Sequence, residues 1–344
     1  MGHSSPEGRW KPEHVLRIES GALNLIFSGE NKPDLLISGY FTSLESLLIH
    51  KLYGVKVIIT TTYLRHPEND PAMRAIQNMM AYNDSFHSRR NFFIVRRNQI
   101  PRRESYFDAY TQDLSSFHEL IPCPQEFDYK HYKHGAKVHY VEPCMTPSLE
   151  HATSGNDIDW NTLIAGYSKI IFATAGSQVL DYEKKAEHLF DCLIQMMDAP
   201  QMQGYHLVLG VGEKLLRSRK WTENDNITVA GWVPQRQLLS SGHVSCAVIH
   251  GGLATIKECI FYGVDFVIAP LGKDQMDNAI RLKENGINNM LDIETSDAGC
   301  FLYYINKVKT DYQMKKNLSK LQKAFVKAEL EKKGLGVILS VLNS

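Results

Sequence analysis

Residues 246–262 read CAVIHGGLATIKECIFY, and they are the most informative part of the sequence. The run from Cys246 to His250 is continuously apolar up to its last residue, which is typical of a strand buried on both faces. Gly251 and Gly252 then permit a tight turn. The apolar residues that follow predict a helix over residues 253–262. Strand, turn and helix in immediate succession form the repeating unit of a parallel α/β sheet.

The same unit repeats on both sides of this stretch. Short, continuous apolar runs predict strands at residues 169–175, 206–210, 227–232 and 265–270. The segments between them predict helices at residues 182–197, 235–241 and 275–285. Continuous rather than alternating apolar runs indicate a sheet whose two faces are both covered by helices.

The N-terminal half contains a second series of this kind. Residues 34–38 and 55–62 predict strands on either side of a helix over residues 44–52, and Val138–Val141 predicts another strand. Residues 64–120 are polar, aromatic and rich in arginine, and we expect helices and loops there. We therefore predict an α/β protein with two Rossmann-like, doubly wound domains. The expected ranges are 1–147 for the N-terminal domain, 148–161 for a polar linker and 162–344 for the C-terminal domain.

In doubly wound folds a ligand lies at the carboxyl ends of the strands, in the crevice between the domains. His250 occupies such a strand end, and the helix that follows presents unpaired N–H groups and a partial positive charge. Gly251 and Gly252 let a phosphate approach the backbone, and Thr255 adds a hydroxyl donor. These residues predict a diphosphate site that needs no metal.

A longer segment carries a resemblance to a known family. It consists of Gly231-Trp-Val-Pro-Gln-Arg-Gln-Leu-Leu, Ile249-His-Gly-Gly-Leu-Ala-Thr-Ile-Lys-Glu, Gly263-Val-Asp and Pro270-Leu-Gly-Lys-Asp-Gln-Met-Asp-Asn-Ala. In residue types and spacing it resembles the donor-binding signature of the UDP-glycosyltransferases, which have the two-domain GT-B fold. The resemblance implies a UDP-sugar as co-substrate and no further cofactor.

The resemblance also implies roles for individual residues. Trp232 would stack on the uracil ring, Gln235 would bind the base or ribose, and Glu258 would accept hydrogen bonds from the ribose. The Asp274-Gln275 pair would hold sugar hydroxyls, and Ser177 would contact the second phosphate. The predicted donor-site residues are Ser177, Trp232, Val233, Gln235, His250, Gly251, Gly252, Ala254, Thr255, Glu258, Asp274 and Gln275.

The N-terminal half matches the family less closely. Family members begin with a strand and a Gly-His loop whose histidine deprotonates the acceptor, and this strand is not found before Pro33. We therefore expect an abbreviated N-terminal domain. The acidic partner of the base would follow the strand at residues 34–38, and that position holds Gly39. The candidates for the catalytic base are His3, in a Gly-His context, and Tyr40 and His66, which follow predicted strands.

Competing motifs are weak. Asp157-Ile-Asp159 has the D-x-D form of metal-dependent sugar transferases, but it lies in the polar linker rather than after a strand, so no metal site is predicted. Gly210–Lys214 lacks the G-x-x-x-x-G-K spacing of a phosphate loop. Within the donor segment, Ala254 replaces the usual Asn and Ser241 replaces a His.

Composition favours a cytoplasmic protein. Hydrophobic residues make up 43% of the chain, as in globular proteins. Lys+Arg and Asp+Glu are equal at 38 each, so the chain has no net charge that would favour binding to nucleic acid. The cysteines are scattered, which suits a reducing compartment, and no apolar run is long enough to span a bilayer. The arginines of Arg89–Arg103 surround the apolar run Phe92–Val95. They predict either a peripheral contact with anionic lipid or a solvated basic rim.

The resemblance, together with these patterns, implies an inverting glycosyltransferase that would move a glucose-type hexose from a UDP-sugar to a hydroxyl acceptor. The acceptor, a small molecule, lipid or polymer, carries no sequence signal. Two alternatives remain open. One is a catalytically silent protein that binds a nucleotide-sugar or a partner, and the other is a membrane-surface lipid or cell-wall sugar transferase of the same fold.

Overall fold

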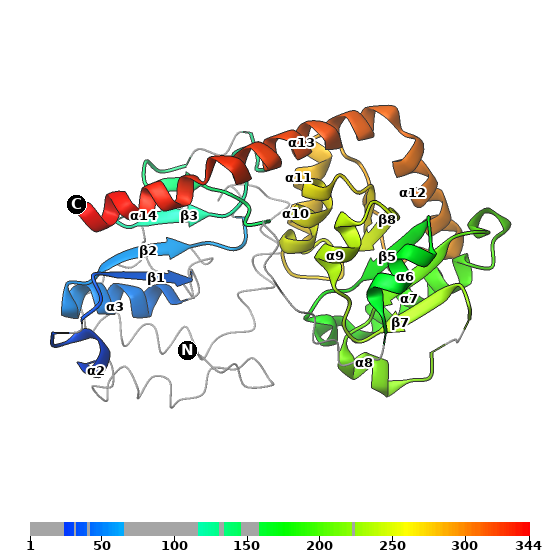
Figure 1. Cartoon of the computed structure of the whole chain (residues 1–344), viewed down its shortest axis with the longest axis horizontal. Coiled ribbons are helices and arrows are strands. Elements are labelled where there is room, and N and C mark those ends of the chain that lie inside the picture. The colour runs from blue at the N-terminus through cyan, green and yellow to red at the C-terminus, as the bar shows by residue number, and fades with distance from the viewer. Residues whose placement is uncertain are drawn as a thin grey trace.

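The computed structural model describes residues 24–30, 32–39, 42–64, 116–130, 134–145, 158–221 and 224–344. These residues form two separate parallel sheets, each flanked by helices (Figure 1). A long pair of helices near the C-terminus runs from one sheet to the other (Figure 1).

The N-terminal sheet has four strands in the order β1-β2-β3-β4, and all neighbours are parallel. The strands are β1 (Leu35–Gly39), β2 (Lys56–Thr60), β3 (His118–Ile121) and β4 (Val138–Tyr140). The short helix α2 (Asn24–Phe27) precedes β1, and the 3-10 helix η3 (Gln125–Phe127) follows β3. Helix α3 (Ser43–Tyr53) connects β1 to β2 and ends at Gly54, whose φ of 64° is the left-handed conformation that glycine adopts at helix ends.

Helices from distant parts of the chain cover the two faces of this sheet. Successive strand residues point to opposite faces. Val57 and Ile59 therefore pack on the α3 side with Leu47. On the other face, Ile58 packs with Val341 of α14 (Lys333–Asn343), which lies against β2 and β3. Helix α13 (Tyr312–Glu331) leads from the C-terminal sheet to α14 (Figure 1).

The C-terminal sheet has five parallel strands in the order β7-β6-β5-β8-β9. They are β5 (Ile170–Thr174), β6 (His206–Gly210), β7 (Ile227–Ala230), β8 (Val244–Ile249) and β9 (Phe266–Ile268). The α-helices of this part are α6 (Trp160–Gly166), α7 (Glu183–Met196), α8 (Glu213–Ser218), α9 (Gln235–Ser240), α10 (Leu253–Tyr262), α11 (Gln275–Glu284) and α12 (Ala298–Thr310). Two 3-10 helices, η4 (Val179–Tyr182) and η5 (Pro200–Met202), lie at the two ends of α7. Every residue of the central strand β5 is buried, as expected for a strand covered on both faces.

Aspartates begin three of these helices. The Asp159 carboxylate accepts hydrogen bonds from the backbone N–H groups of Asn161 (3.1 Å) and Thr162 (3.3 Å) at the start of α6. Asp297 and Asp311 do the same for α12 and α13. Such caps satisfy N–H groups that the helix itself leaves free. The second acid of the D-x-D pattern is thus a helix cap, and Asp157 lies outside the described residues.

The predicted α/β class with Rossmann-like domains is confirmed, and the predicted strands match the observed ones closely. Strand β3 corrects the expectation that residues 64–120 form only helices and loops; residues 65–115 lie outside the described residues. It was missed because His118-Glu-Leu-Ile is short and carries an acid. Glu119 is buried in that strand and accepts a hydrogen bond from the Thr61 hydroxyl. The predicted domain ranges stay a prediction, although residues 160 and 161 of the expected linker already belong to α6.

A buried ion cluster joins the two halves of the chain. Arg281 on α11 is completely buried and donates from Nε to the Asp128 carboxylate, 2.7 Å away. Its Nη1 also pairs with Asp277, one helical turn earlier. The Tyr129 ring packs against the guanidinium, and its centroid lies 4.3 Å from Arg281 Cζ. The Tyr129 hydroxyl donates a hydrogen bond to the Asp277 carboxylate at 2.6 Å. The segment after β3 is therefore fastened to α11 by charge as well as by apolar packing.

Candidate donor-nucleotide site

Parallel strands bring their carboxyl ends to one edge of the C-terminal sheet, where doubly wound folds bind ligands. The loops after β5, β7, β8 and β9 therefore meet at this edge. The predicted donor-site residues all lie in these four loops or in the opening turns of the helices that follow. The fold thus brings together the residues that the sequence predicted.

The turn between β8 and α10 depends on two glycines. Gly251 has a φ of 92°, a conformation that residues with a side chain rarely adopt. A Cβ atom there would also lie 3.0 Å from Cγ2 of Ile268. The first hydrogen bond of α10 runs from Ile256 N–H to the Gly252 carbonyl (3.1 Å). The N–H groups of residues 253–255 precede that bond and point out of the N-terminus of α10, where an anion could accept from them.

The His250 ring lies between two glycines. A Cβ atom on Gly252 would lie 2.4 Å from its Nε2, and one on Gly176 would lie 2.5 Å from it. Burial lowers the pKa of His250 to about 4, with a smaller opposing effect from the Thr174 backbone. Its Nδ1 is buried and forms no hydrogen bond of normal geometry. The ring is therefore neutral at pH 7 and carries a single N–H to donate.

A hydrogen-bond network links α9 to α10 beside this turn. Thr255 and Glu258 are one helical turn apart on the same buried face of α10. Gln235 donates from Nε2 to the Thr255 hydroxyl (3.3 Å) and to the Glu258 carboxylate. Arg236 donates from Nε to the other oxygen of Glu258 (2.9 Å). The Glu258 carboxylate is thus held in place with acceptor capacity to spare, because a carboxylate has about four lone-pair sites.

Trp232 projects from the loop that precedes α9. Its exposed fraction is 57%, so the indole is not part of the core. Its neighbour Val233 is buried and packs over the end of β6, where its Cγ2 would lie 3.3 Å from a Cβ atom on Gly210. Val233 therefore anchors the loop, and the indole face is free to stack on a planar ring.

Gln275 and Asp274 differ in whether their side chains could bind a ligand. The Gln275 side chain is buried, and its Oε1 accepts hydrogen bonds from the backbone N–H groups of Leu271 (2.7 Å) and Gly272 (3.0 Å). Its Nε2 donates to the Tyr182 hydroxyl (2.9 Å). The amide is thus committed to the fold of its own loop.

Asp274 is only partly exposed. One oxygen accepts a hydrogen bond from Asn278 Nδ2 (3.1 Å), and the same nitrogen donates to the Gly251 carbonyl (3.0 Å). Burial raises the pKa of Asp274 above its usual range, and the Asn278 hydrogen bond opposes that effect. Asn278 therefore ties the start of α11 to the β8–α10 turn.

The remaining predicted donor residues are exposed. Ser177 lies in the loop after β5, where Gly176 has a φ of 79° and donates its N–H to the Thr174 hydroxyl (3.1 Å). Ala254 lies in the first turn of α10. Sequence reasoning missed Arg236, Asn278 and Tyr182 as supports of the site. Arg236 and Asn278 lie inside the matched segment, whereas only the fold brings Tyr182 to it.

The candidates for the catalytic base, His3, Tyr40 and His66, lie outside the described residues, as does the segment Arg89–Arg103. Gly39, at the position of the expected acid, is described and exposed at the end of β1. Across the described ranges, no three His, Cys, Asp or Glu side chains gather as metal ligands do. Nor does any helix in them have the length and apolar character needed to cross a membrane.

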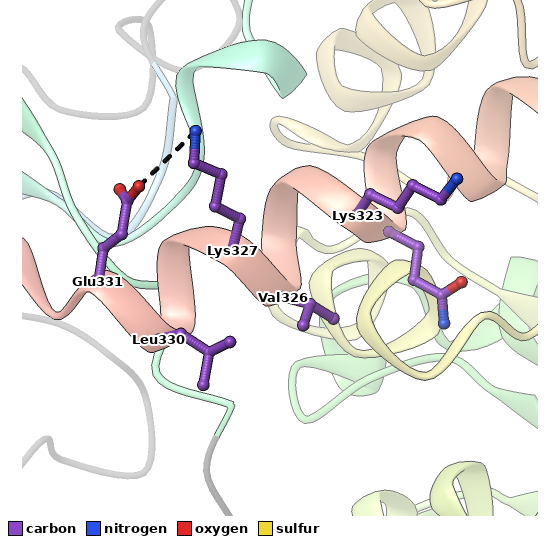
Figure 2. Close-up of a pocket in the computed structure, with 6 residues that line it drawn as sticks. Lys323, Val326, Lys327, Leu330 and Glu331 are labelled. Carbon is purple, nitrogen blue, oxygen red and sulfur yellow. Dashed lines mark ion pairs between the residues drawn. The ribbon is translucent and has the colours of Figure 1, made fainter.

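A surface groove runs along α13, away from these residues in the sequence. Figure 2 shows Lys323, Val326 and Leu330 spaced along this helix, together with the ion pair between Lys327 and Glu331. None of its lining residues is a predicted donor-site residue. It therefore has no part in the site described above.

The chain matches known proteins over this site. The family model described as UDP-glucoronosyl and UDP-glucosyl transferase matches residues 213–328. UDP-glucuronosyltransferase 2B30 of Macaca fascicularis is 33% identical over 96 residues, which are 28% of this chain and 18% of that protein. Human UDP-glucuronosyltransferase 2A3 is 31% identical over 98 residues, which are 28% of this chain and 19% of that protein. The match therefore spans less than a fifth of these relatives' length.

Solved structures resemble a larger part of the chain. The glycotransferase of kitacinnamycin aligns with a TM-score of 0.69 at 18% identity, over 99% of this chain and 85% of that one. UDP-glucose: anthocyanidin 3-O-glucosyltransferase in complex with UDP aligns with a TM-score of 0.61 at 17% identity, over 99% and 85%. These similarities establish the GT-B fold. Residues 213–328 are similar to the UDP-glucoronosyl and UDP-glucosyl transferase family.

Proposed function

We propose that this chain transfers a glucose-type hexose from a UDP-sugar to a hydroxyl acceptor, with inversion at the anomeric carbon. One observation carries the proposal: the β8–α10 turn with its free N–H groups shares a sheet edge with the exposed Trp232 and the anchored Glu258. This edge offers a flat face for a base, an acceptor for ribose hydroxyls and donors for a diphosphate.

The proposed reaction follows from these groups. The acceptor oxygen attacks the anomeric carbon, the bond from that carbon to the diphosphate oxygen breaks, and UDP leaves with the electron pair. The N–H groups at the start of α10, the single N–H of His250 and the Thr255 hydroxyl would stabilise the negative charge on the departing diphosphate. The acceptor proton goes to a general base, for which His3, Tyr40 and His66 remain the candidates.

The same groups lead us to propose that transfer needs no metal and no cofactor beyond the UDP-sugar. Protein N–H donors replace the divalent cation that otherwise neutralises a diphosphate. Activity is expected to survive EDTA. Loss of activity in EDTA, with recovery on adding Mg²⁺ or Mn²⁺, would contradict this part of the proposal.

A second candidate function rests on the end of β1. Gly39 occupies the position where the family's acid is expected, and the nearby groups are the hydroxyls of Ser38 and Thr42, 2.6 Å apart. A base without an acidic partner is poorly oriented. The chain would then bind a nucleotide-sugar without transferring it.

Calorimetric titration with UDP tests the donor site. Trp232→Ala removes the stacking face, so we expect UDP binding to weaken by about 1–3 kcal/mol, the range for base–aromatic stacking. Tyr303→Ala serves as the control, since Tyr303 is also a largely exposed aromatic but lies on α12. Equal UDP affinity in wild type and Trp232→Ala would refute the assignment.

Turnover separates the two candidate functions. A panel of UDP-sugars, including UDP-glucose and UDP-glucuronic acid because the relatives are named UDP-glucuronosyltransferases, is incubated with a set of hydroxyl acceptors. Release of UDP together with a glycosylated acceptor supports the enzyme. Tight UDP binding without transfer from any of these donors favours the silent binder.

A further inference from the structure

Lys273 connects two loops at the carboxyl edge of the C-terminal sheet, called the donor edge below because the predicted donor-site residues lie there. It lies in the loop after β9, and its Nζ pairs with the Asp181 carboxylate (2.5 Å) and with the Gln178 amide oxygen in the segment after β5. The ammonium also lies 5.8 Å from the centre of the Tyr182 ring. Together with the hydrogen bond from Gln275 to Tyr182, these contacts fasten the β9 loop to the β5 loop.

The strand order gives this fastening a particular position. In the order β5-β8-β9, the β8–α10 turn lies between the two loops. Loops two strands apart are separated by about 10 Å, a span that the lysine and aspartate side chains bridge together. The contact therefore links the loops on either side of the start of α10. The loop with Ser177 lies on one side, and the loop with Asp274 lies on the other.

The backbone at Lys273 supports a local role. Its φ of 54° lies in the left-handed region, which is unfavourable for a residue with a side chain. A glycine would relieve that cost but would remove the ammonium. The ion pair is also substantially exposed, at 37% for Lys273 and 55% for Asp181, so it adds little to folding stability.

We propose that Lys273 is a positioning residue for the donor: it sets the spacing between the loop that meets the diphosphate and the loop that meets the sugar. This inference rests on the proposed function. In the proposed donor site, UDP would contact the β5 loop, the β8–α10 turn and the β7 loop, whereas the sugar of a UDP-sugar would also contact Asp274 in the β9 loop. Breaking the contact should therefore weaken UDP-sugar binding more than UDP binding.

The test compares the two ligands on the full chain by calorimetry. UDP-glucose and UDP-glucuronic acid are both titrated, and the tighter one is used with each variant. Lys273→Ala is expected to raise the Kd for the UDP-sugar by about fivefold, the upper value of an exposed ion pair, and the Kd for UDP by less than about twofold. Lys273→Arg should restore UDP-sugar binding, because a guanidinium also pairs with Asp181. Asp181→Asn should match Lys273→Ala, and the double variant should be no weaker than either.

Lys185→Ala is the matched control. Lys185 forms an ion pair with Glu294 at 2.7 Å with similar exposure, but its helix α7 does not line the donor edge. It should leave both Kd values unchanged. If wild type binds UDP and Lys273→Ala binds both ligands as wild type does, loses both equally or binds the UDP-sugar more tightly, the inference is wrong and the proposed function stands. If wild type does not bind UDP, the proposed function and this inference both fall.

Discussion

At the scale of single residues, burial lowers the pKa of two histidines in the C-terminal half, His206 and His250. His206 at the start of β6 is buried, stacks on Tyr167 with ring centres 3.8 Å apart, and shares a 2.8 Å hydrogen bond with the Thr228 hydroxyl. Burial lowers its pKa from 6.5 to about 4, as it does for His250. Both rings are therefore neutral at pH 7, so His250 would present an uncharged imidazole to the diphosphate of the proposed donor.

His206 gives a prediction on stability in acid. The unfolded chain takes up a proton at His206 near pH 6.5 and the folded chain only near pH 4. The free energy of unfolding should therefore fall as the pH drops from 6.5 to 4, and His206 contributes up to roughly 3 kcal/mol of that loss. Urea unfolding of wild type and His206→Gln at several pH values measures it. The variant should gain on wild type as the pH drops, and a constant difference would contradict the prediction.

At the scale of elements, the β8–α10 turn shows what a short sequence can determine. Gly251 is required by its positive φ, whereas Gly252 has an ordinary φ of −63° and is required by the His250 ring. The apolar run, the glycines and the helix that follows all lie within the stretch 246–262. Local pattern therefore predicted this element correctly.

The Gly252 position can be tested without backbone strain. Gly252→Ala places a Cβ atom 2.4 Å from His250 Nε2, so the ring must move. Its N–H would then no longer point at the diphosphate of the proposed donor. UDP affinity should drop by about tenfold, the cost of one lost charge-assisted hydrogen bond. Gly166→Ala is the control, because a Cβ atom there meets nothing within 4 Å and alanine is the better helix former. Unchanged UDP affinity in Gly252→Ala would exclude the proposed part of His250.

Elements and contacts that depend on distant segments were not predictable in this way. Strand β3 is only four residues long and is stabilised by neighbours far along the chain. The pairing of Lys273 with Asp181 joins residues 92 apart, and no local periodicity encodes it. The sequence predicted residues that follow the strands of one sheet, and the structure places them at the carboxyl edge of that sheet. The sequence did not show which of their side chains, such as the Gln275 amide, are already bound within the protein.

At the scale of the whole molecule, one core and one ion cluster join the two sheets. Ile121 at the end of β3 and Cys123 in the segment that follows belong to the same apolar core as the C-terminal sheet. Phe127 packs edge-on against Phe325 of α13, with ring centres 6.2 Å apart. The buried Arg281 then ties Asp128 to α11, across 153 residues of sequence. The junction is therefore packed like a protein interior.

The Arg281 cluster carries the last prediction. Arg281→Ala leaves the buried carboxylates of Asp128 and Asp277 without their cation, so the free energy of unfolding should fall by about 3–5 kcal/mol. Asp128→Asn, which keeps the size of the side chain, should destabilise less, because Arg281 retains Asp277. The control is Arg217→Ala. Arg217 forms an exposed ion pair with Glu213 on the same helix, so its loss should change the free energy of unfolding by less than about 1 kcal/mol.

Thermal melting of the three variants, followed by circular dichroism, orders them. We expect Arg281→Ala to melt lowest, Asp128→Asn next and Arg217→Ala together with wild type. Replacing the cluster with apolar groups of similar volume can be neutral in other proteins, so the cost arises from the carboxylates left unpaired rather than from the ion pair itself. Arg281→Met combined with Asp128→Asn and Asp277→Asn removes all three buried charges, so it should recover much of the lost melting temperature. If Arg281→Ala melts with wild type, or the triple variant melts no higher than Arg281→Ala, buried charge is not what holds this junction.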